Sequence, residues 1–146
     1  MDAIADKLKT MSNFLISRSF PSYNENCGRC AKSVREAIEY AFAPKTLVRK
    51  LSAKDYGSSL ESFGFKNLLI SPQDLVKYKP LVGDVSIIHY EPHGHISAYC
   101  EGVYPKSGQS IKCWVSDFQQ LDMYGGKIRK KSPKVSIYRM SFLNNS

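Results

Sequence analysis

The two halves of the sequence follow different hydrophobic periods. Before Gly83, apolar residues recur every three or four positions, which predicts helices; after it, β-branched and aromatic residues alternate with polar ones, which predicts strands. Helices followed by strands are typical of an α+β fold. We therefore predict N-terminal helices packed on a meandering antiparallel β-sheet. The chain has 146 residues and no repeat or linker, so we expect a single domain, residues 1–146.

The segment that starts at Cys30 has the clearest helical pattern. Apolar residues between Ala31 and Ala41 lie on one stripe, and Pro44 cannot continue the helix. The predicted helices cover residues 2–17, 30–43 and 53–63, the last capped by Gly64, and a brief turn or helix follows residues 71–74. The predicted strands cover residues 84–90, 94–101, 111–117 and 135–140.

The chain carries 21 Lys and Arg residues against 13 Asp and Glu residues, a formal net charge of +8. This charge favours anionic partners, and nucleic acid, an anionic membrane surface and the carboxylate-rich bacterial wall all qualify. Residues 1–20 contain no apolar run long enough for a signal peptide or a membrane span. We therefore expect a chain made in the cytoplasm without a signal peptide and without membrane insertion. It would reach an external substrate through a dedicated secretion machine or phage-type lysis.

Four cysteines are too few for a disulfide scaffold in a domain of this size. Cys100 and Cys113 are able to pair across a hairpin, although the alternation of the two strands argues against it. That bridge stays open and disfavoured, and at least one cysteine invites a chemical explanation.

Cys30 is the candidate nucleophile because it stands at the first turn of a helix, directly after a polar loop that contains glycine. The positive end of the helix dipole and the charge of Arg29 favour its thiolate. The N–H groups of the same turn have no intrahelical partner and can hold the oxyanion that forms when a thiolate attacks an amide carbon. The competing interpretation is a buried cysteine that serves as a small apolar residue.

His95 is the candidate base. It begins a strand that projects His95, Ser97 and Tyr99 to one face, so the imidazole is rigidly aimed. His89 and His93 are interpreted as structural residues.

An imidazole base needs an acceptor for the proton on its far nitrogen, and Asp117 is the candidate. It follows the strand of residues 111–116, which is expected to pair beside the strand of His95. An ordinary carboxylate at a strand end is the competing interpretation. Tyr23, in the loop before the helix, is able to line the cleft or donate to the oxyanion, but a packing role is the simpler interpretation.

Four segments of this sequence, in this order, resemble the papain-like cell-wall peptidases of the NlpC and CHAP type. Their strongest part is the helix headed by Cys30, followed by Gly94-His95 and an alternating strand. The segments are residues 28–38, 82–85, 94–99 and 114–118.

The resemblance implies a papain-like fold and a cysteine amidase that hydrolyses an amide in the peptide stem or crosslink of bacterial peptidoglycan, without a metal or another cofactor. The positions that match are Cys30, His95 and Asp117, and Val34, four residues after Cys30, favours Cys30 over Cys27 as nucleophile. A short, basic chain of this type resembles the amidase effectors that type VI secretion systems inject into rival bacteria. Such an effector acts in the periplasm of the target and implies a cognate immunity (inhibitor) protein, with peptidoglycan rather than nucleic acid as its substrate.

Three other functions stay open. Two thiols and two imidazoles, from Cys27, Cys30, His93 and His95, suggest a zinc site, although their spacing is unusual for the common fingers. The charge and the basic C-terminal region suggest a nucleic-acid-binding module without catalysis. The same Cys–His pair also supports an acyltransferase, in which an amine takes the place of water.

Overall fold

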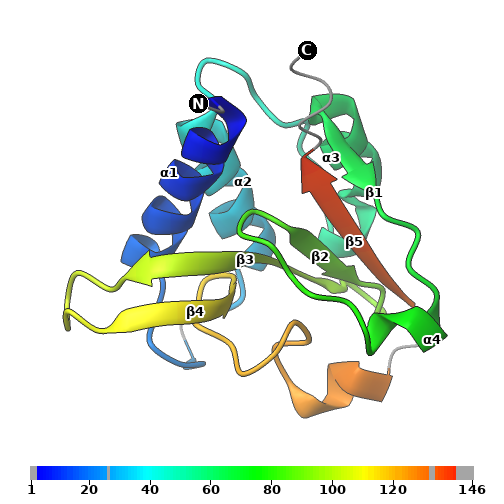
Figure 1. Ribbon diagram of the computed structural model, residues 1–146. Coiled ribbons are helices and arrows are strands. Elements are labelled where there is room, and N and C mark those ends of the chain that lie inside the picture. Colours follow the sequence, from blue (N-terminus) through cyan, green and yellow to red (C-terminus); the bar gives the residue numbers. More distant parts are fainter. Residues whose placement is uncertain (1–2, 26, 132–133, 141–146) are drawn as a thin grey trace.

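The computed structural model describes residues 3–25, 27–131 and 134–140. Its sheet is antiparallel and has the strand order β1-β5-β2-β3-β4 (Figure 1). The strands are β1 (Phe65–Asn67), β2 (Val85–Ile88), β3 (His95–Val103), β4 (Ser110–Val115) and β5 (Val135–Met140).

The α+β class is confirmed, but the prediction of a sheet that meanders throughout is wrong. Only β2, β3 and β4 follow one another as neighbours; β5 returns to pair with the other edge of β2, and β1 extends the sheet beyond β5. The cause is the segment after β4, which does not continue the meander but crosses to the other end of the sheet (orange in Figure 1). β1 was not predicted because three residues are too short to show an alternating pattern.

Helices α1 (Ala3–Arg18) and α2 (Cys30–Ala41) confirm the first two predicted helices to within two residues at each end. The third predicted helix is divided into a 3-10 helix, η1 (Ala53–Asp55), and α3 (Gly57–Phe63). It ends as expected at Gly64, whose φ of 129° suits a residue without a Cβ. The remaining helices are α4 (Pro72–Leu75) and the 3-10 helix η2 (Lys127–Lys131). Among the described residues, none of these helices combines the length and apolarity needed to cross a membrane.

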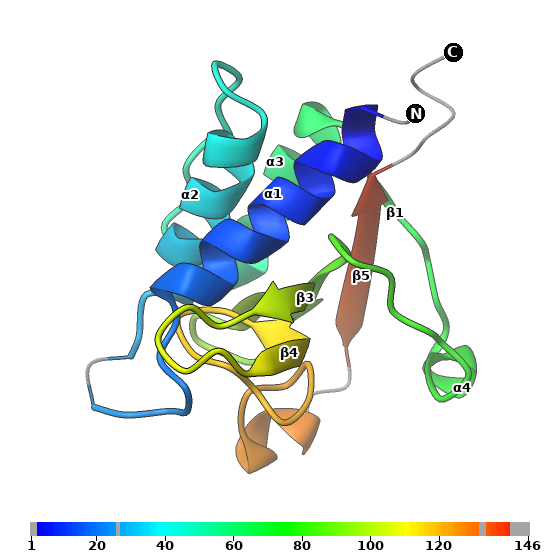
Figure 2. The same ribbon diagram turned by 60° about the vertical axis from the view of Figure 1, so that its left-hand side comes forward.

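The sheet separates the hydrophobic core from a second, polar layer. α1 and α2 contact β3, and Ile96, Ala98 and Cys100 of that strand belong to the main core cluster with residues of both helices. In Figure 2, α1 and α2 lie on one side of β3 and β4, and the segment from residue 116 to 131 lies on the other. Because side chains of a strand alternate, His95 and Ser97 point toward this second layer.

Cys100 and Cys113 are direct partners in the register of β3 and β4, so their side chains share one face of the sheet. The prediction that strand alternation disfavours their pairing is therefore wrong, because the pairing register of β3 and β4 cannot be read from the sequence. Both thiols are free in the structure.

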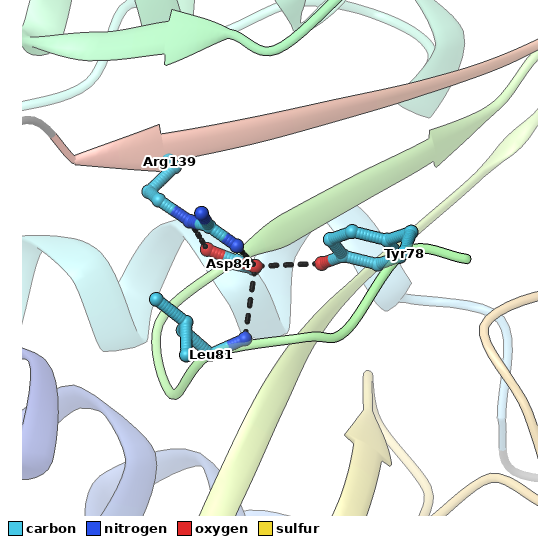
Figure 3. A network of polar contacts seen from close by, with 4 residues as sticks. All are labelled: Tyr78, Leu81, Asp84 and Arg139. Atoms are coloured by element: carbon cyan, nitrogen blue, oxygen red, sulfur yellow. Dashed lines mark hydrogen bonds and ion pairs between the residues drawn. The ribbon is translucent and has the colours of Figure 1, made fainter. Parts of the chain in front are cut away.

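Asp84 ties the segment before β2 to the end of β5 (Figure 3). Its carboxylate accepts two hydrogen bonds from the guanidinium of Arg139, at 2.8 and 2.7 Å, one from the Tyr78 hydroxyl at 2.6 Å and one from the Leu81 N–H at 3.0 Å. Asp84 is only 1% exposed, so these donors offset the cost of burying a polar side chain. Burial and the neighbouring Asp84 raise the pKa of Tyr78, which keeps its hydroxyl a donor at neutral pH.

We expect Asp84→Ala to lower the free energy of unfolding by about 2 to 3 kcal/mol, because it leaves Arg139 and Tyr78 without their acceptor. The loss stays below that of a fully buried pair because Arg139 is partly exposed. Urea denaturation of both proteins measures it. The control is Glu91→Ala, which breaks the 2.7 Å pair with Lys54 at a position that is 76% exposed and should cost less than about 1 kcal/mol. Equal losses in the two variants would contradict the role given to Asp84.

Candidate active site

Cys30 is the first residue of α2 and lines a cleft of about 960 Å³. The rest of the lining comes from the loop before α2, the first turns of α2, residues 49–53, Tyr56, residues 93–95, and the chain after β4. Gly28, two residues before Cys30, has a φ of 137°, a backbone conformation that side chains with a Cβ rarely adopt. The thiol therefore stands at a sharp entry into a helix, as the sequence predicted.

The thiol of Cys30 is the resting form of this residue. Burial raises its pKa, the N–H groups of Ile96 and Ala31 that face the sulfur oppose the rise, and the negative charge of Asp117 adds to it. The prediction that the thiolate of Cys30 is favoured is therefore wrong for the free protein, because the desolvation of the sulfur exceeds the opposing effects of the two N–H groups and of the charge of Arg129.

The contact with Ile96 also locates the sulfur relative to the predicted base. Ile96 directly follows His95, so a sulfur that faces the N–H of Ile96 lies at the start of β3. Cys30 and His95 line the same cleft. The structure thus brings together the two residues that the sequence proposed as nucleophile and base.

His95 is 2% exposed, and its Nε2 lies 2.7 Å from Oε1 of Gln120. The amide of Gln120 is oriented by its own Nε2, which donates to the carbonyl of Asp122 at 2.8 Å. An acceptor at Oε1 requires the proton of the neutral imidazole to sit on Nε2. Nδ1 is then the nitrogen that can accept a proton.

The imidazole of His95 is neutral over the whole physiological range. Burial lowers its pKa to about 4, and the hydrogen bond to Gln120, which favours the protonated form, offsets only part of this shift. The charge of Arg129 lowers the pKa further, and the charge of Asp117 raises it. The site therefore holds a neutral thiol and a neutral base.

Asp117 does not take the orienting role predicted for it, since the hydrogen bond of the imidazole goes to Gln120. Asp117 is buried directly after β4, where its Oδ2 accepts from the N–H groups of Gly28 at 2.6 Å and Arg29 at 2.8 Å. Its Oδ1 lies 3.3 Å from the Ser116 hydroxyl. Asp117 therefore anchors the loop that leads into Cys30.

Gln120 was missed because its place depends on a chain reversal that has no sequence signature. The Ser116 N–H donates to the carbonyl of Phe118, and the Gln120 N–H donates to the carbonyl of Trp114, so the chain folds back on β4. This reversal brings the side chain of Gln120 into contact with the imidazole of His95. The available signal in the sequence was a polar side chain close to Asp117. That signal does not single out Gln120, because Gln119 has the same side chain and donates to the hydroxyl of Ser19 instead.

The other histidines have structural partners, in line with their interpretation. His93 Nδ1 lies 3.1 Å from the Ser52 hydroxyl at the rim of the cleft, and His89 Nε2 lies 2.9 Å from the Ser136 hydroxyl. Tyr23 lines the cleft, is 66% exposed, and meets Phe118 edge to face.

The suggested zinc ligands do not converge. Cys27 lies beside Asn24, His93 beside Ser52 and His95 beside Gln120. Within residues 3–25, 27–131 and 134–140, no three His, Cys, Asp or Glu side chains form a group that could hold a metal ion.

The site thus places in one cleft a thiol at a helix start and a buried imidazole whose Nδ1 is unprotonated. A thiol and a neutral imidazole are the minimal equipment for nucleophilic attack on an acyl carbon. Among solved structures, the chain is similar to the type VI native effector–immunity complex Tae3–Tai3 from Ralstonia pickettii. The two chains are 34% identical over 92% of this chain and 98% of that one, with a TM-score of 0.68. The chain belongs to the Tae3 family of type VI effectors. This confirms the resemblance to type VI effectors that the sequence indicated, and the shared length shows that it extends over the fold as a whole. No protein-family model and no curated protein matches this Tae3-family chain.

The buried imidazole predicts how stability depends on pH. Folded His95 stays neutral down to about pH 4, whereas in the unfolded chain it protonates near pH 6.5. The unfolded state therefore binds more protons in this window, and stability is lost as the pH falls through it, by about 3 kcal/mol in total. Unfolding free energies measured by urea titration between pH 7 and 4 should fall less steeply for His95→Gln than for the wild type. His93→Gln, which removes an exposed imidazole, is the control; if it flattens the curve as much as His95→Gln does, the burial of His95 is not the cause.

Proposed function

We propose that this effector is a cysteine amidase of the papain-like NlpC/CHAP type that hydrolyses an amide bond in the peptide stem or crosslink of bacterial peptidoglycan. The observation that carries the proposal is the meeting of Cys30 and His95 in one cleft, in a chain of a type VI effector family. A thiol beside an imidazole is the usual equipment for acyl chemistry on an amide.

The reaction starts from the neutral pair. As the sulfur of Cys30 bonds to the amide carbon, Nδ1 of His95 accepts the thiol proton. The imidazolium then gives that proton to the amine nitrogen as the C–N bond breaks, which leaves a thioester on Cys30. Water then gives one proton to the same imidazole as its oxygen bonds to the thioester carbon. The C–S bond breaks, the imidazolium returns that proton to the sulfur of Cys30, and the carboxylic acid departs and ionises in solvent.

Gln120 orients the imidazole of His95, and Asp117 positions the loop before Cys30. Gln120 holds the proton on Nε2 of His95 through the 2.7 Å hydrogen bond, which keeps Nδ1 available. Asp117 fixes the loop before Cys30 and occupies the N–H groups of Gly28 and Arg29. Those two donors are therefore not free for the oxyanion. In the part of the chain that the structure describes, the N–H of Cys30 has no hydrogen-bond partner, so it is the donor we assign to the oxyanion.

The biological setting follows from the family. The neighbouring structure is an effector–immunity complex, and we extend this to the present chain: a cognate immunity protein binds it in the producing cell and covers the cleft. Delivery by a type VI machine into the periplasm of a rival bacterium brings the enzyme to the wall. The chain then acts as an antibacterial toxin.

Digestion of purified peptidoglycan, with mass spectrometry of the fragments, tests the proposal. The wild type should create new amine and carboxylate ends, and Cys30→Ala should reduce their rate of formation by about 1000-fold or more, because the nucleophile is gone. Cys27→Ala, in the same cleft, is the matched control and should keep most of the activity. Cleavage that survives in Cys30→Ala contradicts the proposal, and transfer of the fragment to an added amine in place of water would make the enzyme a transferase.

The pH profile tests the pairing of His95 with Gln120. Since neutral His95 is the base and burial holds its pKa at about 4, kcat/KM of the wild type should decline only as the pH falls toward 4. Gln120→Glu places a negative charge beside Nε2, stabilises the imidazolium and should move this acid limb up by about 1 to 2 pH units.

Gln119→Glu makes the same chemical change one residue away, on a side chain that bonds Ser19 and not His95, and its profile should match the wild type. An acid limb that moves equally in both variants would mean that Gln120 has no special relation to the base.

A further inference from the structure

The cleft gathers the positive charge of the molecule. Its 21 lining residues include six cationic and two anionic side chains, so this seventh of the chain carries half of the net charge of +8. Most of the cations have no acidic partner: among the described residues of the lining, only Arg35 forms an ion pair, with Glu39 at 3.0 Å. The cationic residues are Arg29, Lys32, Arg35, Arg49, Lys50 and Arg129, and the anionic ones are Glu36 and Asp117.

Arg129 differs from the exposed cations because it is half-buried, and from the buried Arg35 because it forms no ion pair with a described residue. It belongs to η2, and its Nη1 donates to the carbonyl of Gly125 at 3.2 Å. Gly125 packs directly on the imidazole, since a Cβ added there would lie 2.6 Å from Nε2 of His95. This chain of contacts holds the guanidinium beside His95 at the wall of the cleft.

No carboxylate of the described residues pairs with this guanidinium, although acidic residues are close in sequence. Asp122 pairs with the neighbouring Lys130 at 2.9 Å instead. A guanidinium has five donors, and the single hydrogen bond to Gly125 leaves its fork geometry available to a planar, bidentate acceptor such as a carboxylate.

The charge of Arg129 acts on both members of the catalytic pair. After burial and the hydrogen bond to Gln120, the charge of Arg129 is the next influence on the pKa of His95, and it lowers it. Its charge also lowers the pKa of the Cys30 thiol, so Arg129 favours the thiolate and disfavours the imidazolium. These two effects oppose each other in the proton transfer from Cys30 to His95, and what Arg129 adds to the cleft is an unpaired guanidinium beside the reacting groups.

We propose that Arg129 binds a free carboxylate of the substrate close to the scissile amide, so that the enzyme selects wall peptides in which the residue flanking that amide keeps its carboxylate over those in which it is amidated. This inference rests on the proposed function, because it assigns the substrate class of the same cleft. The exposed cations of the lining supply a more general attraction for the anionic stem peptide.

Two synthetic stem peptides that differ at one group, a free carboxylate in one and a carboxamide in the other, test the inference. The wild type should cut the carboxylate peptide about 10 to 100 times more efficiently in kcat/KM than the amide, the range expected for a charge-assisted hydrogen bond. Arg129→Gln should lose this factor on the carboxylate peptide, mainly through KM, and should change little on the amide. Arg129→Lys should recover part of the preference.

Lys127→Gln is the matched control, because Lys127 lies in the same 3-10 helix, carries the same charge, is exposed and does not line the cleft. It should keep the preference of the wild type. Equal losses on both peptides in Arg129→Gln, or equal rates of the wild type on both, would overturn the inference.

Binding separates this inference from the proposed function. Affinities of the inactive Cys30→Ala protein for the two peptides, with and without Arg129→Gln, should show the same 10- to 100-fold preference and its loss. If the wild type cuts neither peptide but Cys30→Ala still prefers the carboxylate through Arg129, the proposed hydrolysis fails and the inference stands. If Cys30→Ala binds both peptides alike, the inference fails whatever the wild type cuts.

Discussion

The carboxylate of Asp117 joins the start of α2 to the end of β4, and the geometry of the site depends on that junction. One oxygen accepts the N–H groups of both Gly28 and Arg29, so the loop that delivers Cys30 has its backbone direction set by the sheet. Charge-assisted hydrogen bonds of this kind are strong and short. The anchor also has an electrostatic consequence, because its negative charge raises the pKa of the thiol it positions. Precise placement of the proposed nucleophile is thus obtained together with a neutral resting state.

Burial decides the protonation states of the pair. The segment after β4 folds back over the second face of the sheet, where Gln120 and Gly125 enclose the imidazole of His95. Desolvation raises the pKa of the thiol and lowers that of the imidazole, so both shifts disfavour the ion pair. In the mechanism we propose, charge separation then occurs only during the attack, where donors and acceptors that are already in place stabilise it without reorganisation.

The parts of this molecule that could be predicted from sequence are those governed by local period. The limits of α1 and α2, the position of Cys30 at a helix start and the projection of His95 from a strand all follow from spacings of two or 3.6 residues. The parts that could not be predicted depend on where segments meet in space. Strand β5 returns to β2, Asp117 bonds a loop 88 residues earlier, and Gln120 reaches His95 through a reversal without Gly or Pro. Periodicity contains no information about such contacts.

The net charge shows the same difference between composition and arrangement. In the sequence, +8 spread over the whole chain fits many anionic partners and chooses none. The fold gathers half of that charge around one cleft and places one guanidinium, without a carboxylate partner among the described residues, beside His95. In our proposal a carboxylate of the substrate binds there, so the charge serves two purposes. The exposed cations attract anionic peptides in general, and Arg129 distinguishes among them by a geometry that only the fold provides.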